Sequence, residues 1–579
     1  MIKKLAASIR EYKKHTILAP VFMTLEVAME VIIPYVTADL IDKGITAGNM
    51  NHIVKTGVFL ALVALFAMMF GMLSGTFGAR ASAGFAKNLR QDMFHNIQSF
   101  SFPNIDKFSA SSLITRLTTD VTNVQNAFQM LIRMFVRSLI MLILALIMSF
   151  SVNMKISLIF VGAVPILAIG LFSVINYVHP TFVKVFKTYD KLNKIVQENL
   201  RGVRVVKSFV REENEEKKFG KISGSIYDDF VKAERIIAFN APLMQVCMYS
   251  CMLLSAWIGA KLIVGSEMTT GQLMSVITYA MQILMSLMML SMVFVMIIIS
   301  RASSERICEV LLENSTLTNC KKPVFAVKDG SVSFKNADFS YTNDKSKLCL
   351  KNINIDIKSG ETVGIIGGTG SGKTSLVQLI SRLYDLTGGE VSVGGVDVKN
   401  YDIEAIRNAV AVVLQKNTLF SGTISENLRW GNENATDDDI KKACLLAQAD
   451  EFISTLPEGY NTHIEQGGSN VSGGQKQRLC IARALLKKPK ILILDDSTSA
   501  VDTKTDSLIR KAFREELSNT TKLIIAQRIS SVQDADKIIV LDGGKLVAIG
   551  THDELLLTND IYSEVYNSQI KGADFDEAN

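Results

Sequence analysis

A glycine-rich stretch beginning at Gly367 carries residue types that bind phosphate. It follows the apolar run TVGII and reads GGTGSGKTS, so it lies where a strand passes into a helix. Glycines let backbone N–H groups turn inward around phosphate oxygens, and the following helix directs its positive end to the same place. Lys373 is expected to reach the β- and γ-phosphates, and Thr374 to bind Mg2+. The predicted phosphate-binding residues are Gly367, Gly368, Thr369, Gly370, Ser371, Gly372, Lys373, Thr374 and Ser375.

Asp495 supplies the second part of a magnesium-dependent nucleotide site. It ends the apolar run ILIL, and its carboxylate can hold Mg2+ through water beside Thr374. The next residue is a second acid, Asp496, where a magnesium-dependent ATPase usually has glutamate. Together the two motifs predict that the chain binds ATP with Mg2+ as cofactor.

A second candidate phosphate cradle opens another helix at Ser472, Gly473, Gly474 and Gln475. Taken alone, this stretch is better explained as a glycine-rich helix cap. One chain does not need two cradles for the same γ-phosphate, however. Beside the first motif and Asp495, the pattern favours a head-to-tail dimer in which each ATP lies between the glycine-rich loop of one subunit and this cradle of the other.

Composition and charge exclude several other classes of protein. The chain has 579 residues, of which 48% are hydrophobic, and a net charge of +6. This length predicts more than one domain, and the mild charge without a basic block does not indicate a nucleic-acid partner. The seven cysteines follow no metal-binding or paired spacing, as expected in a reducing cytosol. The N-terminus is basic and amphipathic, and no small-residue cleavage site closes the apolar stretch after it, so no cleavable signal is expected.

The first part of the chain contains long apolar runs of the length that a bilayer requires. Each is near the ~20 residues of a membrane-spanning helix. We expect six spans, at about 17–41, 54–79, 130–152, 156–178, 238–264 and 272–300. Lys and Arg concentrate before the first span and in the two long gaps, which places both termini and both long loops in the cytosol. We therefore predict a multi-pass protein of the cell (plasma or inner) membrane, which has the lipid bilayer as a partner.

The chain from Gly330 onward has the pattern of a soluble α/β domain. Short β-branched runs such as TVGIIG, AVAVVLQ and KLIIAQR alternate with helical stretches. The predicted organisation is a transmembrane domain over 1–310, a linker over 311–329, a nucleotide-binding domain over 330–570 and a tail over 571–579. The fold class is thus an α-helical membrane domain joined to an α/β nucleotide-binding domain.

These motifs in one chain resemble a half-transporter of the ABC exporter family, with six transmembrane helices fused to one P-loop NTPase domain. The resemblance implies that Tyr341, in DFSYTND, stacks on adenine. It implies that Gln415 senses Mg2+ and γ-phosphate, and that the loop Ser499–Asp502, with Asp502 at its end, crosses to the partner's site. Coupling helices are implied near Pro103–Ser112 and Arg211–Phe219.

Two positions depart from the family pattern at the catalytic centre. The acid that polarises the attacking water is usually glutamate, and here it is Asp496, which is one methylene shorter. A displacement of about 1 Å at a reacting group can cost roughly a hundredfold in rate. The family usually has histidine where this chain has Gln527, and an amide can donate a hydrogen bond but cannot carry a proton. We interpret these two residues as a weakened catalytic pair.

The intact cradle at Ser472–Gln475 beside a weakened pair resembles the degenerate-site subunit of heterodimeric bacterial multidrug exporters. The hypothesis is that a partner half-transporter supplies the glutamate and histidine and uses this chain's cradle. A homodimer with two slow sites is the first alternative. A membrane protein that ATP gates but that does not pump is the second, and a soluble or DNA-associated ATPase is a rival from another class.

Four residues of the membrane half are candidates for a substrate cavity. Glu26 and Glu30 lie four apart on one face of the first span, near mid-membrane, where ionisable groups usually face a polar interior. They could attract cationic, amphipathic cargo, or they could pair with a basic group such as Arg137. Met285 and Met292 belong to a methionine stripe on the sixth span, which suits either adaptable binding or ordinary packing. The cargo class stays open among drugs, lipids and peptides.

Overall fold

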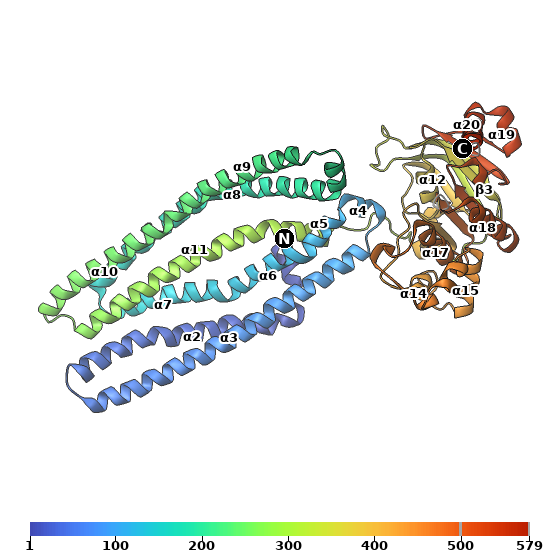
Figure 1. Ribbon diagram of the computed structural model, residues 1–579. Coiled ribbons are helices and arrows are strands. Elements are labelled where there is room, and N and C mark those ends of the chain that lie inside the picture. The colour runs from blue at the N-terminus through green and yellow to red at the C-terminus, as the bar shows by residue number, and fades with distance from the viewer. Residues whose placement is uncertain (497–500, 577–579) are drawn as a thin grey trace. The chain divides into compact units, whose positions relative to one another are not determined.

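The computed structural model describes residues 1–496 and 501–576 (Figure 1). Contacts divide the chain into two compact units. The first contains Met1–Gln98 and Ser109–Glu313, and the second contains Ser99–Phe108 and the chain from Asn314 onward. The domain boundaries at 310, 329 and 570 stay predictions. The short segment Ser99–Phe108 groups with the C-terminal unit although it lies between two helices of the first.

The first unit is built from long helices. Its elements are α1 (Ile2–Ala7), η1 (Arg10–Tyr12), α2 (Lys13–Asp39), η2 (Leu40–Ile45), α3 (Met50–Gln98), α5 (Ala110–Thr115), η3 (Arg116–Asp120), α6 (Val121–Met130), η4 (Leu131–Phe135), α7 (Val136–Val152), α8 (Met154–Ser208), α9 (Glu212–Ala238), α10 (Asn240–Val264) and α11 (Thr270–Leu312). Figure 1 shows α2 beside α3 and α8 beside α9 as antiparallel pairs, and both pairs are in contact. The helical membrane domain is therefore confirmed.

Among the residues that the structure describes, five helical stretches are long and apolar enough to cross a membrane. They cover Arg10–Ile45, Met50–Gln98, Ala110–Val152, Glu212–Val264 and Thr270–Leu312. They contain five of the six expected spans. The expected span 156–178 lies in α8, where the described apolar stretch is Met154–Gly170 and several later side chains lie outside the described residues. Side-chain caps fix where these helices begin. Asn153 Oδ1 accepts the N–H groups of Lys155 and Ile156, and Thr269 forms a capping box with Gln272.

The second unit is an α/β domain with two main sheets. One is antiparallel, in the order β2-β1-β4-β5, and the other has the order β12-β11-β3-β10-β9-β6 and is parallel except for β12. The strands are β1 (Val332–Phe339), β2 (Leu350–Ile357), β3 (Thr362–Gly367), β4 (Gly388–Val393), β5 (Val396–Asp397), β6 (Val410–Val413), β7 (Gly422–Thr423), β8 (His463–Ile464), β9 (Ile491–Asp495), β10 (Thr521–Ile525), β11 (Lys537–Asp542) and β12 (Lys545–Gly550). The strands expected from the β-branched runs are confirmed.

Helices connect these strands. They are α4 (Phe102–Lys107), α12 (Lys373–Ile380), α13 (Ile403–Ala409), α14 (Ile424–Arg429), α15 (Asp437–Leu446), α16 (Asp450–Thr455), α17 (Gly473–Leu486), α18 (Thr503–Glu516), α19 (His552–Thr558) and α20 (Asp560–Asp576), with 3-10 turns η5 (Val398–Asn400), η6 (Gly459–Asn461), η7 (Gln466–Gly468) and η8 (Ile529–Ser531). Crossover helices cover the faces of a parallel sheet and bury its strands.

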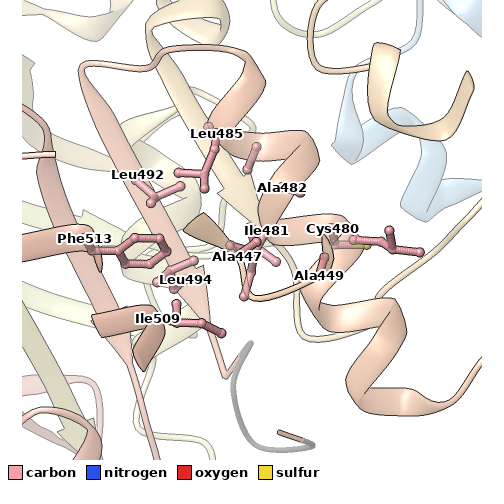
Figure 2. Packing of buried hydrophobic residues seen from close by; sticks show 14 of the residues in the cluster. Ala447, Ala449, Cys480, Ile481, Ala482, Leu485, Leu492, Leu494, Ile509 and Phe513 are labelled. Carbon is pink, nitrogen blue, oxygen red and sulfur yellow. The ribbon is translucent and has the colours of Figure 1, made fainter. Parts of the chain in front are cut away.

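A hydrophobic core fixes α17 against the parallel sheet. Figure 2 shows Ile481 and Leu485 of α17 facing Leu492 and Leu494 of β9, with Phe513 of α18 on the same side. All five side chains are buried. Burying a large apolar side chain is worth about 1.5–3 kcal/mol, so this packing holds the second half of α17 against β9.

Candidate nucleotide site and its surroundings

The predicted nucleotide residues gather at one edge of the parallel sheet. The neighbouring strands β3, β10, β9 and β6 all end at this edge. The glycine-rich loop follows β3, Gln527 follows β10, Asp495 and Asp496 lie at the end of β9, and Gln415 follows β6. Ligands of open α/β sheets bind outside the carboxyl ends of the strands, which is where these residues lie.

The loop between β3 and α12 has backbone angles and a close packing that favour glycine. Gly370 and Gly372 have φ of 80° and 95°, and a Cβ on Gly372 would come within 2.6 Å of a Leu350 methyl carbon. Lys373 Nζ donates to the carbonyl oxygens of Gly367 at 2.7 Å and Gly368 at 2.9 Å. The ammonium group thus lies over the loop backbone. Burial lowers the pKa of Lys373, whereas Asp495 and Asp496 act to raise it.

Thr374 and Asp495 present oxygen atoms of the kind that Mg2+ prefers. Thr374 Oγ1 donates to Asp495 Oδ1 at 3.2 Å. Asp495 is only 3% exposed, and burial together with the neighbouring Asp496 raises its pKa, although Thr374 and Lys373 oppose this. No cluster of three or more His, Cys, Asp or Glu occurs in the described chain. A hydroxyl and a single carboxylate suit a cation that takes its other ligands from water and phosphate, as Mg2+ does.

Asp496 and Gln527 are in direct contact. Gln527 Nε2 donates to Asp496 Oδ2 at 2.9 Å, and Gln415 Nε2 approaches the same oxygen at 3.4 Å. Asp496 has φ of 49°, a left-handed conformation that short polar residues tolerate best. Gln477 of α17 also contacts it, because Gln477 Nε2 donates to its carbonyl oxygen at 3.4 Å. The sequence did not single out Gln477, which follows the second cradle by only two residues.

Tyr341 lies beside the first helical turn of α12. Its hydroxyl lies 2.8 Å from Ser375 Oγ, so it borders the glycine-rich loop. Tyr341 is 45% exposed, and its ring makes an edge contact with Tyr384, with ring centroids 5.1 Å apart. An exposed aromatic face at this place can stack on a planar base.

The second cradle forms a capping box at the start of α17. The Ser472 hydroxyl accepts the N–H of Gln475 at 3.3 Å, and Gln475 Oε1 accepts the N–H of Ser472 at 2.9 Å. The glycine-rich cap that the sequence also suggested is therefore present, with Gly473 and Gly474 in the first helical turn. Asp502 caps α18 by accepting the Thr505 N–H at 2.9 Å. Ser499 lies outside the described residues.

The second unit also contains α4, one of the two expected coupling segments. Tyr384 Oη donates to Asp106 Oδ2 at 2.7 Å, and the Phe102 ring packs on Tyr384 with centroids 6.0 Å apart. Asn104 is buried and donates to the carbonyl of Asn314 at 3.0 Å. Burial and the hydrogen bond to Asp106 raise the pKa of Tyr384. Neither Tyr384 nor Asp106 was singled out from the sequence, because no local pattern links positions so far apart.

Arg137 holds both glutamates of the first span. Its guanidinium contacts Glu26 Oε1 at 2.5 Å and Glu30 Oε2 at 2.7 Å. The structure thus forms the ion pair that the sequence offered as one alternative. Met285 and Met292 are each 62% exposed, so neither belongs to the packed core of its own unit.

Comparison with known proteins agrees with this geometry. The model of the ABC transporter transmembrane region matches residues 16–301, and that of the ABC transporter domain matches residues 350–499. The ABC transporter ATP-binding protein YfiB of Bacillus subtilis is 36% identical over 98% of this chain and 99% of its own length. A Mycobacterium tuberculosis ABC transporter ATP-binding protein is 33% identical over 99% of each chain.

The fold also matches a solved structure. A bacterial Atm1-family ABC exporter with ATP bound superposes with a TM-score of 0.85 at 24% identity, covering 96% of this chain and 99% of that one. Membrane region and ATP-binding domain thus follow each other in one polypeptide with the exporter-type fold. The chain belongs to the ABC transporter family and is a multi-pass half-transporter.

Proposed function

We propose that this chain is one subunit of a heterodimeric ATP-driven exporter, in which its own ATP site hydrolyses slowly or not at all. The observation that carries the proposal is the 2.9 Å contact between Asp496 and Gln527, the two residues that depart from the family pattern. The cradle at Ser472–Gln475 keeps its family sequence and starts a well-packed helix. One chain would thus have a weak site of its own and lend a sound cradle to its partner.

In the proposed site, the loop of residues 367–375 holds the ATP phosphates. Lys373 would leave the carbonyl oxygens of Gly367 and Gly368 and pair with phosphate, whose negative charge would oppose the effect of burial, which lowers the pKa of Lys373. Tyr341 would stack on adenine. Thr374, Asp495 and Gln415 would hold Mg2+, which neutralises phosphate charge when it is bound with ATP.

Hydrolysis at this site would be weak for two reasons. Asp496 is too short to place its carboxylate where a glutamate would be. Its Oδ2 also accepts hydrogen bonds from Gln527 and Gln415, so this oxygen is engaged by donors rather than directed at water. Gln527 itself can donate a hydrogen bond but cannot take up or release a proton.

Exposed features on both units support a dimer. Phe209 and Val210, at the turn between α8 and α9, are 71% and 81% exposed. Large apolar side chains at the tip of a cytosolic hairpin suit docking on a second protein surface. This turn immediately precedes the second expected coupling segment, Arg211–Phe219, and we propose that it docks on the partner half-transporter. Asp502 would face the partner's ATP.

The first coupling segment offers a route from nucleotide to membrane helices. Tyr384 touches Tyr341 on one side and donates to Asp106 of α4 on the other. Closure of the two nucleotide domains on ATP would therefore move α4, which leads into α3 and α5. Alternating access of the membrane helices would follow, with both termini in the cytosol and the membrane domain in the cell membrane.

The cargo is proposed to be an amphipathic drug, lipid or peptide. Met285 and Met292 are exposed, and flexible thioethers suit a surface that accepts varied apolar ligands. Arg137 offsets only one of the two formal carboxylate charges of Glu26 and Glu30, so their contribution to a cavity would be a polar patch with one net negative charge.

The test is the native composition of the detergent-extracted complex, isolated by a tag on this chain from its own cell. A second, different half-transporter in equal amount is the expected result, and its sequence should carry glutamate and histidine at the two positions. Copies of this chain alone would overturn the heterodimer and leave the homodimer with two slow sites. Uptake of an amphipathic dye into inside-out vesicles then separates a pump from a protein that ATP only gates.

A further inference from the structure

The C-terminal helix α20 is joined to the loop that carries Gln527. Gln569 Oε1 accepts the N–H of Ile529 at 2.9 Å, and Gln569 Nε2 donates to the carbonyl of Gln527 at 2.8 Å. Both ends of one amide therefore bind the loop backbone on either side of Arg528. Gln527 in turn donates its own amide to Asp496.

The loop backbone has the shape that such an amide recognises. Arg528 has φ of −94° and ψ of 128°, an extended conformation. In an extended segment, the carbonyl of one residue and the N–H of the residue two positions on point to the same side, as they do toward a neighbouring strand. Gln569 thus pairs with residues 527 and 529 as a strand would. Because its two hydrogen bonds to the loop are both to backbone atoms, it fixes the position of whichever side chain stands at 527.

The remainder of α20 is anchored independently of Gln569. Tyr562 is fully buried in the same core as Ile529, and its hydroxyl lies 2.7 Å from His552 Nδ1. His552 also makes an edge contact with Tyr566 at a centroid distance of 5.1 Å. These contacts fix α20 against the domain, and the two hydrogen bonds of Gln569 hold the 527–529 loop in place relative to this helix.

We propose that Gln569 is a positioning residue for the γ-phosphate end of this chain's ATP site. The inference rests on the proposed function, in which Gln527 belongs to the weakened catalytic pair, and it adds that the Gln527 amide donates a hydrogen bond to the γ-phosphate. Gln569 would hold the 527 carbonyl so that the Gln527 amide faces Asp496 and the terminal phosphate. Loss of this support should weaken binding of ATP but not of ADP, which has no γ-phosphate.

The experiment uses the full-length complex with Gln569→Leu, and Asn567→Leu is the matched control. Asn567 lies on the same helix and is exposed, and within the described part of the chain its amide donates only to Ser563 of α20 at 3.3 Å. Hydrogen–deuterium exchange of the peptide containing Ile529 reports the link itself. Competition by ATP or ADP against photolabelling of this chain with azido-ATP reports nucleotide preference.

We expect Gln569→Leu to expose the Ile529 amide to exchange and to weaken competition by ATP about five- to tenfold, the equivalent of one hydrogen bond. Competition by ADP and the Asn567→Leu control should stay at the level of the unmodified chain. Gln569→Glu keeps the acceptor for Ile529 but loses the donor to Gln527, so it should retain protection of the amide and still lose preference for ATP.

Three results would overturn the inference. Unchanged exchange at Ile529 would show that the link is absent in solution. Faster exchange with an unchanged ratio of ATP to ADP would show that the link does not position Gln527. An equal loss of ATP and ADP, or faster exchange in the Tyr562 peptide, would show general loosening of the domain. If the unmodified chain takes up no photolabel, the proposed function itself fails, and this result is distinct from all three.

Discussion

Replacing Asp496 by glutamate tests whether a missing methylene limits hydrolysis in this chain's own site. The aspartate carboxylate stands at the end of β9, and its Oδ2 accepts from Gln527 at 2.9 Å and from Gln415 at 3.4 Å. One added methylene moves the carboxylate about 1 Å farther from the backbone, and a displacement of that size at a reacting group is worth roughly a hundredfold in rate.

Two costs reduce this gain. The backbone at 496 has φ of 49°, and this left-handed conformation costs more free energy for glutamate than for aspartate. The free energy of unfolding should therefore fall by about 1 kcal/mol. Gln527 would still supply neither a proton nor a charge. We expect Asp496→Glu to raise the rate at this site about 10- to 100-fold, and the further change Gln527→His to raise it again.

The assay must report this chain and not its partner. Azido-ATP is crosslinked to the chain with the radiolabel on either the α- or the γ-phosphate, and the loss of γ-label relative to α-label gives the rate of hydrolysis at this site. Asp496→Asn is the matched control, because it keeps the shape and removes the base, and it should show no gain. If Asp496→Glu takes up the same α-label but loses γ-label no faster than the unmodified chain, side-chain length is not what limits the site.

Three further predictions concern other parts of the molecule. Burial raises the pKa of Asp495, so the ionised carboxylate destabilises the nucleotide-free domain. Asp495→Asn should therefore raise the Tm measured by thermal unfolding without nucleotide. This gain should appear as the pH rises through the raised pKa and vanish at lower pH. Tyr384→Phe removes the hydrogen bond to Asp106. It should leave photolabelling by azido-ATP unchanged but reduce the stimulation of ATPase activity by cargo. Stimulation equal to that of the unmodified chain would refute the coupling role. Arg137→Met leaves two carboxylates of α2 unpaired and should lower stability in detergent by about 3 kcal/mol, whereas Arg133→Met, which breaks no ion pair within the described chain, should cost clearly less.

The fold could be predicted largely because its signals are local. Apolar runs of bilayer length gave the spans, and β-branched runs gave the strands of the parallel sheet. The nucleotide edge followed from strands that end in polar motifs, since parallel strands present their carboxyl ends together. The sequence left open whether Glu26 and Glu30 form ion pairs with Arg137, because such a pair depends on how the two helices pack.

Contacts between distant side chains and backbone could not be predicted in this way. Asp106 meets Tyr384 only after α4 joins the second unit. Gln569 binds main-chain atoms of residues 527 and 529, and every residue offers the same main-chain atoms. A glutamine on an exposed helix near the end of a chain carries no sequence signal of such a role. Only the fold brings its amide to the loop.

The structure changes how the two departures from the family pattern should be weighed. In the sequence, Asp496 and Gln527 lie 31 positions apart and count as two independent changes. In the fold, the amide of one donates to the carboxylate of the other, and residues in one hydrogen-bonded network do not act additively. In the single variant Gln527→His, the histidine would lie beside an aspartate that is one methylene shorter than glutamate. In the single variant Asp496→Glu, the glutamate would lie beside an amide that cannot exchange protons. We therefore expect Asp496→Glu and Gln527→His made singly to raise the rate by factors whose product is smaller than the factor gained when both are made together.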